Sequence, residues 1–454
     1  MPTTTDVLIV GGGPAGMMCG ITAAQFCPEK RVLLVRPEEQ AIVPCGIPYI
    51  FGTLGGTDED LAGRGSFLSA GGNLLTGKIS SVDLARHEAR LEDNSTIRWE
   101  RLVLATGSTP YVPPIKGRNL DGVFQIHKNY DYLDALLTNI LPGIGRLAIL
   151  GGGFIGVEFS DELRKRDIEV HLIEQKERLL AASFDIDASQ AVETKLRSVG
   201  VNIHTGTTVT EIVGDNRGHH VSGVRLDNGQ QLQVEAVLIA IGTYPDTRLA
   251  TAMGLTLSRS GGIWVDGFQQ TREDPHVFAV GDCAHKQDFF TRHASHAMLA
   301  SQAAAEGRIA GMNLYSLKLP RTNAGTIAVY ASQIDNLAFG VAGMTEDTAR
   351  KIGFEVFTGD SRLPDHHPAT MPDTHEIKCR LVFDANSERL IGGQVIGGPT
   401  TAEILNIVSV AIQLRATATD LASFQFGSHP RLTAPVHPIV SATGEALRKR
   451  LNKP

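Results

Sequence analysis

One glycine-rich pattern occurs twice in the chain, each time directly after a short apolar run. The first copy is Gly11-Gly12-Gly13-Pro14-Ala15-Gly16 after Val7 to Val10, and the second is Gly151-Gly152-Gly153-Phe154-Ile155-Gly156 after Leu147 to Leu150. Four consecutive apolar residues are typical of a strand buried on both faces of a parallel sheet. The GxGxxG spacing is a weak motif alone, but between a strand and a helix it indicates dinucleotide binding. The chain is therefore predicted to contain two Rossmann-type units.

The three spaced glycines of each copy have separate physical tasks. The first (Gly11, Gly151) allows a tight turn, the second (Gly13, Gly153) lets a pyrophosphate approach the backbone, and the third (Gly16, Gly156) lets helix and strand pack closely. Free N–H groups at the start of the following helix bind the phosphates. We expect Pro14 and Ala15 to lie in the same phosphate-binding turn.

The residue at the end of the second strand of each unit differs between the copies. Glu174 follows Val170 to Ile173 and stands 23 residues after Gly151, where a carboxylate accepts a hydrogen bond from a ribose 2′-hydroxyl and repels a 2′-phosphate. The second unit is therefore predicted to prefer NADH over NADPH. The first unit has Arg36 at this position. Either Glu38 or Glu39 binds the ribose there, or Arg36 lies against the adenine.

Further sequence similarities between the two halves indicate a duplicated nucleotide-binding domain, with the second copy inserted into the first. Leu104-Ala105-Thr106-Gly107 corresponds to Ile239-Ala240-Ile241-Gly242, and Thr76 to Ile79 corresponds to Thr205 to Val209. At 454 residues the chain is too long for one ordinary core. The predicted fold class is α/β, with a third, α+β domain at the C-terminus. The expected boundaries are 1–113 with 246–324, then 114–245, then 325–454.

Composition excludes several classes of partner. The net charge is −7 and no block of lysine and arginine is long enough to follow a phosphate backbone, so nucleic acid is not expected. No basic-then-apolar N-terminal segment and no run of about 18 apolar residues occurs, so we expect neither a signal peptide nor a membrane span. Five scattered cysteines do not form a disulfide framework and suit a reducing cytoplasm. The histidines at 366, 367 and 375 lack regular spacing, so we expect no metal site.

Together with a later Val280-Gly281-Asp282 segment, these motifs resemble the pyridine nucleotide–disulfide oxidoreductases over nearly the whole chain. The resemblance implies FAD in the first unit, NADH in the second, and a C-terminal interface domain that forms a homodimer. It implies that Asp282 lies near the ribityl chain and that Glu158 lies near the nicotinamide. The cofactor-binding residues expected on these grounds are Gly11, Gly13, Pro14, Ala15, Gly16, Arg36, Ile79, Ala105, Thr106, Gly107, Gly281, Asp282, Gly151, Gly153, Gly156, Glu158, Glu174 and Gly242.

Within this family, the segment Pro44-Cys45-Gly46-Ile47-Pro48-Tyr49 resembles the branch with a single redox cysteine. Two-cysteine members carry a second cysteine five positions later, and Ile50 stands there in this chain. The branch contains coenzyme A-disulfide reductases, persulfide reductases, NADH oxidases and NADH peroxidases. The resemblance therefore implies that Cys45 is the catalytic thiol.

A histidine near the C-terminus is the candidate base. His429 lies in a His-Pro segment that resembles the one reaching the partner's flavin site in two-cysteine members. The glutamate that orients the imidazole there is missing, since Ala434 and Pro435 occupy the region, so a surface histidine is an equal alternative. His437 and Tyr330 are less favoured candidates.

Three functions compete at the sequence level. In the first, NADH reduces the flavin, which passes two electrons to Cys45 and on to a small disulfide or persulfide. Coenzyme A would need cations for its phosphates, and the nearby ones are Arg64 or, from a partner, Arg321, Arg362 and Arg431. The second is an NADH oxidase that reduces O2 through a Cys45 sulfenate. The third is a flavin-bound NADH sensor with little turnover.

Overall fold

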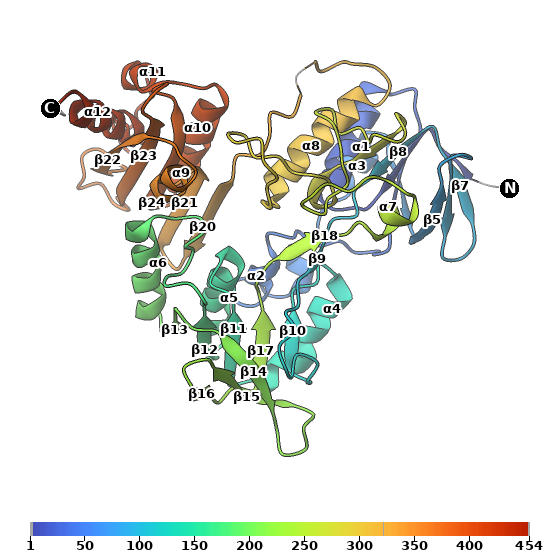
Figure 1. Ribbon diagram of the computed structural model, residues 1–454, viewed down its shortest axis with the longest axis horizontal. Coiled ribbons are helices and arrows are strands. Elements are labelled where there is room, and N and C mark those ends of the chain that lie inside the picture. Colours follow the sequence, from blue (N-terminus) through green and yellow to red (C-terminus); the bar gives the residue numbers. More distant parts are fainter. Residues whose placement is uncertain (1–2, 321, 453–454) are drawn as a thin grey trace. The chain divides into compact units, whose positions relative to one another are not determined.

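The computed structural model describes residues 3–320 and 322–452, which divide into two compact units (Figure 1). Among the described residues, the first unit contains those within 1–113, 125–143 and 242–326, and the second contains those within 114–124, 144–241 and 327–454. Each unit is described separately below. Within the described ranges, every helix is either too short or too polar to cross a lipid bilayer.

The first unit is built on a five-stranded parallel sheet with the strand order β19-β8-β2-β3-β4. Its strands are β2 (Val7–Val10), β3 (Val32–Arg36), β4 (Asn73–Thr76), β8 (Arg101–Leu104) and β19 (Val277–Ala279). All four residues of β2 are buried, as expected for a central strand with helices or loops on both faces. The carboxyl ends of β2, β8 and β19 lead directly into the glycine turns at 11, 107 and 281.

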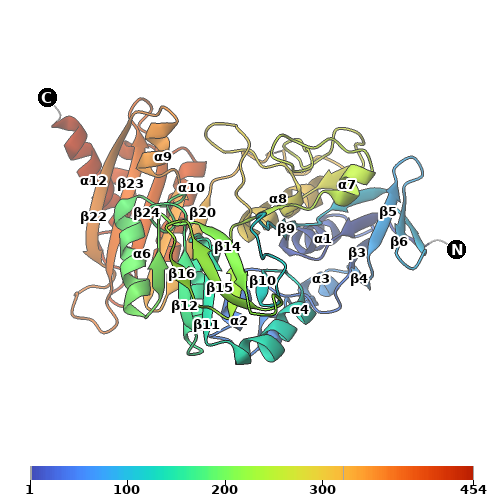
Figure 2. The same cartoon turned by 60° about the horizontal axis from the view of Figure 1, so that its bottom comes forward.

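Two helices, α1 (Pro14–Phe26) and α8 (Ala300–Asn313), pack closely against each other in this unit (Figures 1 and 2). Glycines on α8 allow the approach: a Cβ on Gly307 would lie 2.4 Å from the carbonyl oxygen of Ala15. The sequence predicts a helix from Ser295, but the structure begins it at Ala300. Residues 295–299 are extended or irregular instead, and Ser295 donates its backbone N–H to Lys286.

A smaller sheet of order β1-β7-β6-β5 belongs to the same unit. It consists of β1 (Thr3–Thr4), β5 (Ile79–Asp83), β6 (Glu88–Leu91) and β7 (Thr96–Arg98), and β5, β6 and β7 are antiparallel. The short elements of the unit are α2 (Ile47–Ile50), η1 (Thr57–Asp60), α3 (Gly65–Ser69), α4 (Tyr130–Ala135), η2 (Leu136–Ile140), η3 (Leu141–Gly143), α7 (Arg248–Ala252), η4 (Gly281–Cys283) and the pair β9 (Ser108–Pro110) with β18 (Thr243–Pro245).

The second unit repeats the five-stranded arrangement in the order β10-β17-β11-β12-β13. Its strands are β10 (Val123–Gln125), β11 (Arg146–Leu150), β12 (Glu169–Ile173), β13 (Asn202–His204) and β17 (Ala236–Ile239), with helices α5 (Phe154–Arg164) and α6 (Ile186–Ser198). The strands β17, β11, β12 and β13 stand in the same order as β8, β2, β3 and β4 in the first unit. A side sheet of β14 (Val209–Gly214), β15 (Val221–Leu226) and β16 (Gln231–Leu232) completes this part.

The C-terminal part of the second unit is an antiparallel sheet of order β20-β21-β24-β23-β22 with helices against it (Figure 2). The strands are β20 (Val329–Ile334), β21 (Leu337–Gly343), β22 (Val356–Pro364), β23 (Glu376–Asp384) and β24 (Leu390–Gly397). Helix α10 (Thr401–Gln413) packs on β21 and β24, and α12 (Pro438–Leu451) packs on β22 and β23. Two short helices, α9 (Glu346–Lys351) and α11 (Ala418–Ser423), complete it.

Candidate active site and nucleotide-binding sites

The glycine turn of the first unit has the shape of a phosphate site. Gly11 adopts φ +115°, and a Cβ there would lie 2.1 Å from the carbonyl oxygen of Ala105 at the end of β8, so no other residue fits. A Cβ on Gly13 would meet nothing within 4 Å. The turn is therefore closed on the protein side and open on the side where a pyrophosphate would approach the start of α1.

The second glycine turn has the same construction and contains the predicted carboxylate. Gly151 adopts φ +110°, and a Cβ on Gly153 would again meet nothing within 4 Å. Glu174 Oε2 accepts a hydrogen bond of 2.7 Å from the backbone N–H of Gly152, and its Oε1 accepts one of 2.8 Å from Lys176. The carboxylate is thus fixed against the glycine turn, at the place predicted for the ribose hydroxyls.

Arg36 occupies the equivalent position in the first unit. Its stem crosses the glycine turn, because a Cβ on Gly12 would lie 2.6 Å from Arg36 Cδ. The side chain is buried, and its Nη2 donates a 2.7 Å hydrogen bond to the carbonyl oxygen of Glu39. Burial lowers the pKa of Arg36, as does the nearby Arg64, while Glu38 opposes the shift. Arg36 therefore stands where the second unit has Glu174, and its side chain packs against the glycine turn at Gly12.

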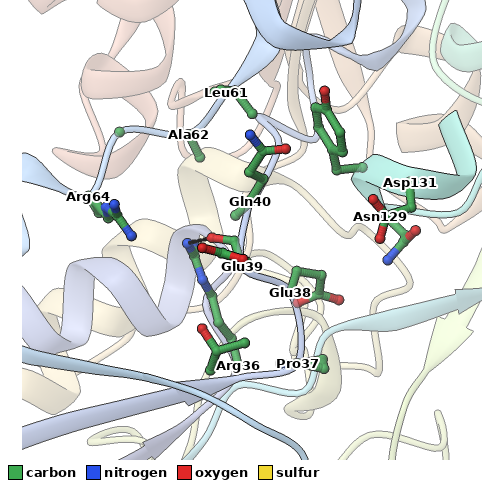
Figure 3. Close-up of a pocket in the computed structure, with 14 residues that line it drawn as sticks. Arg36, Pro37, Glu38, Glu39, Gln40, Leu61, Ala62, Arg64, Asn129 and Asp131 are labelled. Atoms are coloured by element: carbon green, nitrogen blue, oxygen red, sulfur yellow. Dashed lines mark hydrogen bonds between the residues drawn. The ribbon is translucent and has the colours of Figure 1, made fainter. Parts of the chain in front are cut away.

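A cavity of about 880 Å³ opens beside Arg36 (Figure 3). It is formed by the chain after β3, by residues 61–64 and by residues 129–131, all within the first unit. Figure 3 shows the guanidinium of Arg36 lying next to Glu39, with Arg64 directed toward it from the other side. The cavity lies beside the arginine that crosses the glycine turn, and its lining mixes charged and apolar side chains, which fits the adenosine end of a dinucleotide. FAD therefore fits the residues present in this unit.

The segment after β19 presents Asp282, whose carboxylate is held by two donors. Its Oδ2 accepts hydrogen bonds from Ser108 Oγ at 2.7 Å and from Lys128 Nζ at 3.0 Å. Burial alone would raise the pKa of Asp282, but the charge of Lys128 and the bond from Ser108 lower it overall. Asp282 is consequently an ionised acceptor at neutral pH. Nearby, Thr106 Oγ1 donates a 2.6 Å bond to the carbonyl oxygen of Asp246 and anchors the turn at Gly107.

A buried ion pair that the sequence analysis missed holds Gly281 from both sides. Glu306 Oε2 accepts hydrogen bonds from the backbone N–H of Gly281 at 2.9 Å and from Lys286 Nζ at 2.7 Å. Lys286 Nζ in turn donates to the carbonyl oxygen of Gly281. Lys286 and Glu306 are only 4% and 1% exposed, so the pair is almost fully desolvated. Lys286 and Glu306 follow Gly281 by 5 and 25 positions, and this spacing forms no recognisable motif, so the sequence carries no signal for the pair.

Cys45 lies in a tight turn directly before α2, and its side chain is exposed. The turn is closed by a hydrogen bond of 2.8 Å from Gly46 N to Val43 O, and Val43 N donates to the carbonyl oxygen of Asp60. A Cβ on Gly46 would lie 1.7 Å from Asp60 Oδ1, so the carboxyl group of Asp60 rests directly against the glycine that follows the cysteine. Burial raises the pKa of Asp60 to about 6.

The other four cysteines are buried, which separates them chemically from Cys45. Burial raises the pKa of Cys19 and of Cys379 to about 12, and it also raises that of Cys283. A thiol acts as a nucleophile only as the thiolate. Cys45 is therefore the one cysteine of the chain with both solvent access and a position in a turn beside a helix.

In the second unit, Glu158 on α5 is half-buried and accepts a 2.7 Å hydrogen bond from Ser332 Oγ on β20. Burial raises the pKa of Glu158 to about 7, with Glu162 adding to the effect and Ser332 opposing it. Next to it, Tyr330 stacks on Phe154 of the glycine turn, with ring centroids 4.6 Å apart. Tyr330 thus packs against the second glycine turn through Phe154. Glu158, with its pKa of about 7, titrates close to neutral pH.

The two C-terminal histidines have different environments. His429 is exposed in a turn in which its Nδ1 accepts from Arg431 N, and loop residue His366 Nε2 lies 2.8 Å from Arg431 O. His437 is buried, stacks on Phe426 and accepts from Ile439 N at 3.3 Å as the N-cap of α12. Burial lowers the pKa of His437 to about 4. His437 therefore has a structural role, and His429 alone is available to a ligand or a partner.

The remaining predicted cofactor residues lie where the fold requires them for packing or turns. Ile79 is 8% exposed and belongs to the core of the first unit. A Cβ on Gly16 would lie 2.0 Å from Gly11 O, and one on Gly156 would lie 1.9 Å from Gly151 O. Gly242 adopts φ +108° after β17. Pro14 and Ala15 form the first turn of α1.

Comparison with known proteins decides the family. The pyridine nucleotide-disulphide oxidoreductase profile matches residues 5–307, and the dimerisation-domain profile of the same family matches residues 332–438. The chain is a pyridine nucleotide-disulphide oxidoreductase. The family and the fold class predicted from the sequence are confirmed, and the protein is an NAD(P)H oxidoreductase of the FAD-dependent type.

Relatives of this oxidoreductase carry two kinds of name. An NADH oxidase of Methanocaldococcus jannaschii is 27% identical over 98% of this chain and 99% of its own. An NAD(P)H coenzyme A polysulfide/persulfide reductase of Pyrococcus horikoshii is 30% identical over 86% of this chain and 87% of its own. Among solved structures, an NAD-dependent persulfide reductase from A. fulgidus is 26% identical, with a TM-score of 0.89 over 98% of this chain and 83% of that one.

Proposed function

We propose that this oxidoreductase passes electrons from NADH through FAD to Cys45 and from there to a small disulfide or persulfide. The observation that carries the proposal is the environment of the five cysteines: Cys45 is exposed and the other four are buried. A thiol with solvent access next to a turn of the flavin-binding unit is available to a small acceptor. The motif has Ile50 where a second cysteine would stand, so the sulfur chemistry uses one protein thiol.

Bound FAD supplies the transfer of two electrons from NADH to sulfur. The chain supplies the nucleophile, since the Cys45 thiolate attacks a sulfur of the acceptor and forms a mixed disulfide or persulfide while the other sulfur leaves as a thiolate. Two electrons that NADH supplies would then break that new bond, which regenerates the Cys45 thiolate and releases the remaining sulfur of the acceptor as a thiolate or, from a persulfide, as hydrosulfide. When FAD is bound, the carboxylate of Asp282 would accept a hydrogen bond from the ribityl chain, and Arg36, Glu38 or Glu39 would bind the adenosine end.

A coenzyme A polysulfide or persulfide is the acceptor class that the name of the P. horikoshii relative suggests. Its phosphates need cations. Arg64 is directed into the cavity beside Arg36, whereas Arg362 forms an ion pair with Glu376 and Arg431 is exposed beside His429. Arg321 lies outside the described residues. The alternative, an NADH oxidase that forms a Cys45 sulfenate, is favoured by the name of the M. jannaschii relative.

We also propose that the enzyme is a homodimer that joins through residues 325–454, with 1–113 and 246–324 binding FAD and 114–245 binding NADH. Several large apolar side chains are exposed in the proposed dimer region. They are Val410, Leu414, Phe424, Leu432 and Val436. A second copy covering these side chains would bring the exposed His429 of one protomer toward the other. His429 is then the proposed base, acting across the interface.

The acceptor is identified by steady-state NADH oxidation with O2, coenzyme A disulfide and polysulfide in parallel. Wild type, Cys45→Ser and the control Cys27→Ser, which alters a buried cysteine at the end of α1, are compared. We expect Cys45→Ser to abolish turnover with disulfide and persulfide while Cys27→Ser retains it. Full activity of Cys45→Ser with both sulfur acceptors would refute the thiol mechanism. Turnover with O2 alone would favour the oxidase, and none with any acceptor would favour the sensor.

The preference for NADH is tested at Glu174. Its carboxylate is already held by Gly152 N and Lys176 N, so it is a preorganised acceptor for a ribose hydroxyl and a fixed charge against a 2′-phosphate. Glu174→Ala should reduce the ratio of kcat/KM for NADH to that for NADPH at least tenfold. An unchanged ratio would mean that another residue selects the ribose.

A further inference from the structure

Three titratable side chains converge in the first unit, away from the glycine turns and from Cys45. His87 lies in the turn between β5 and β6, and Asp274 and His276 lie in the segment before β19. His87 Nε2 is 3.6 Å from Asp274 Oδ2, and His276 Nδ1 is 3.4 Å from Asp274 Oδ1. One nitrogen or oxygen atom from each of the three residues lies within 4.8 Å of the other two.

These separations match the geometry of a small metal ion. Bonds of about 2.0–2.2 Å in a tetrahedral zinc site place neighbouring ligand atoms about 3.3–3.6 Å apart. The distances from His87 Nε2 to Asp274 Oδ2 and from His276 Nδ1 to Asp274 Oδ1, 3.6 and 3.4 Å, already lie near that spacing. Two imidazoles and one carboxylate are also the ligand types that zinc, nickel and cobalt share.

The histidine rings are held in place by neighbours other than the proposed ligand. His87 adopts φ +49°, a left-handed conformation that is unfavourable for a residue other than glycine. Its ring stacks on Trp99 with centroids 4.3 Å apart, and it meets the ring of His276 edge-on at 5.3 Å. A backbone conformation of this kind persists only where the surroundings enforce it, and it is more frequent at functional sites.

The carboxylate and the second histidine are fixed by the backbone. Asp274 Oδ1 accepts a 2.7 Å hydrogen bond from His276 N, and the carbonyl oxygen of Asp274 accepts from Val277 N at 3.1 Å. His276 O accepts from Leu102 N on β8. The side chains of His87, Asp274 and His276 remain 34%, 15% and 41% exposed, so an ion can enter and water can complete its coordination.

We propose that His87, Asp274 and His276 form a binding site for one divalent transition-metal ion of the zinc, nickel or cobalt type. The ion would join the β5–β6 turn to the start of β19, two segments almost 190 residues apart in the chain. Because β19 leads into Gly281 and Asp282, the bound metal would stabilise the strand that presents the flavin-contacting turn. The site is independent of the electron-transfer route through Cys45.

Tryptophan fluorescence reports on this site because Trp99 stacks directly on His87. The chain has two tryptophans, so Trp264→Phe leaves Trp99 as the only one. Cys45→Ser is added because an exposed thiolate binds the same metals. The FAD-loaded double variant is first freed of metal by a chelator and then titrated with Ni²⁺. Zn²⁺, which does not quench tryptophan fluorescence, is added afterwards as a competitor. We expect quenching that saturates at one equivalent of Ni²⁺ at micromolar concentration and that Zn²⁺ reverses.

Ligand variants decide whether the three side chains are responsible. His87→Asn retains a residue that tolerates left-handed φ, and Asp274→Asn retains an acceptor for His276 N; each should weaken Ni²⁺ binding at least tenfold. His220→Asn is the matched control, because His220 is an exposed histidine that lies 3.8 Å from Asp121 and belongs to no such three-residue group. Binding only at millimolar metal, or equal binding by Asp274→Asn and the parent, would show that the cluster is merely a hydrogen-bonded contact and overturn the proposal.

Discussion

The buried carboxyl group of Asp60 provides the sharpest quantitative prediction. Asp60 is 5% exposed, lies against Gly46 beside Cys45, and has an Oδ2 atom without a hydrogen-bond partner. Burial disfavours its charged form and raises the pKa from the ordinary value of 3.8 to about 6. The folded protein therefore keeps Asp60 protonated over a pH range in which the unfolded chain ionises it.

The sign of the pH effect follows from proton binding. Between pH 3.8 and about 6 the folded state binds the extra proton, so the contribution of Asp60 to stability is fully present below pH 3.8 and decreases as pH rises through about 6. At 1.36 kcal/mol per pKa unit, the cost of folding with Asp60 grows by about 2 kcal/mol between pH 4.5 and pH 7.5. Asp60→Asn has the same shape and does not titrate, so it should not show this loss.

Thermal unfolding of the FAD-loaded protein at pH 4.5 and 7.5 measures the effect as a difference between variant and parent. For a domain of about 200 residues, 1 kcal/mol corresponds to about 2–4 °C. The midpoint of Asp60→Asn, relative to the parent, should therefore rise by about 4–8 °C from pH 4.5 to pH 7.5. Asp58→Asn is the control, because Asp58 belongs to the same short helix η1 but is exposed and accepts from Tyr130. An equal difference in unfolding midpoint between Asp60→Asn and the parent at both pH values would refute the protonated state of Asp60.

Two further predictions concern the ion pair at Gly281 and the carboxyl group on α5. Lys286→Met should leave Glu306 as an unpaired buried charge and cost about 3–5 kcal/mol, with loss of FAD on gel filtration. Lys286→Met with Glu306→Gln should recover most of that stability; a double variant as unstable as the single one would contradict this. Because the pKa of Glu158 is raised to about 7, kcat/KM for NADH should change around pH 7 in the parent and stay flat in Glu158→Gln. The same inflection in both proteins would assign it to another group.

Local patterns in the sequence were sufficient for the main plan of the fold. Each glycine turn, its preceding strand and its following helix are adjacent in the chain, so their spacing predicts both units. Strands β2, β3, β11 and β12 were predicted to within a residue or two, because a buried parallel strand is a continuous apolar run. The late start of α8 was missed because its N-cap, Leu299, is not a residue that marks a helix start.

The contacts that refine the site depend on tertiary structure instead. Asp60 follows Cys45 by 15 residues with no recognisable spacing, and only the folded turn brings its carboxyl group to Gly46. Lys286 and Glu306 are ordinary surface residue types until two segments bury them around Gly281.

The sequence by itself determined the two nucleotide-binding units and the family, and it singled out Cys45 as the proposed redox cysteine. Short, contiguous sequence motifs with fixed stereochemical requirements specify these features. Only the tertiary structure decided which side chains surround them. It also brought His87 from the first chain segment of the first unit together with Asp274 and His276 from its last segment. Side chains distant in the sequence acquire their pKa values and possible ligands only from packing, which no local pattern encodes.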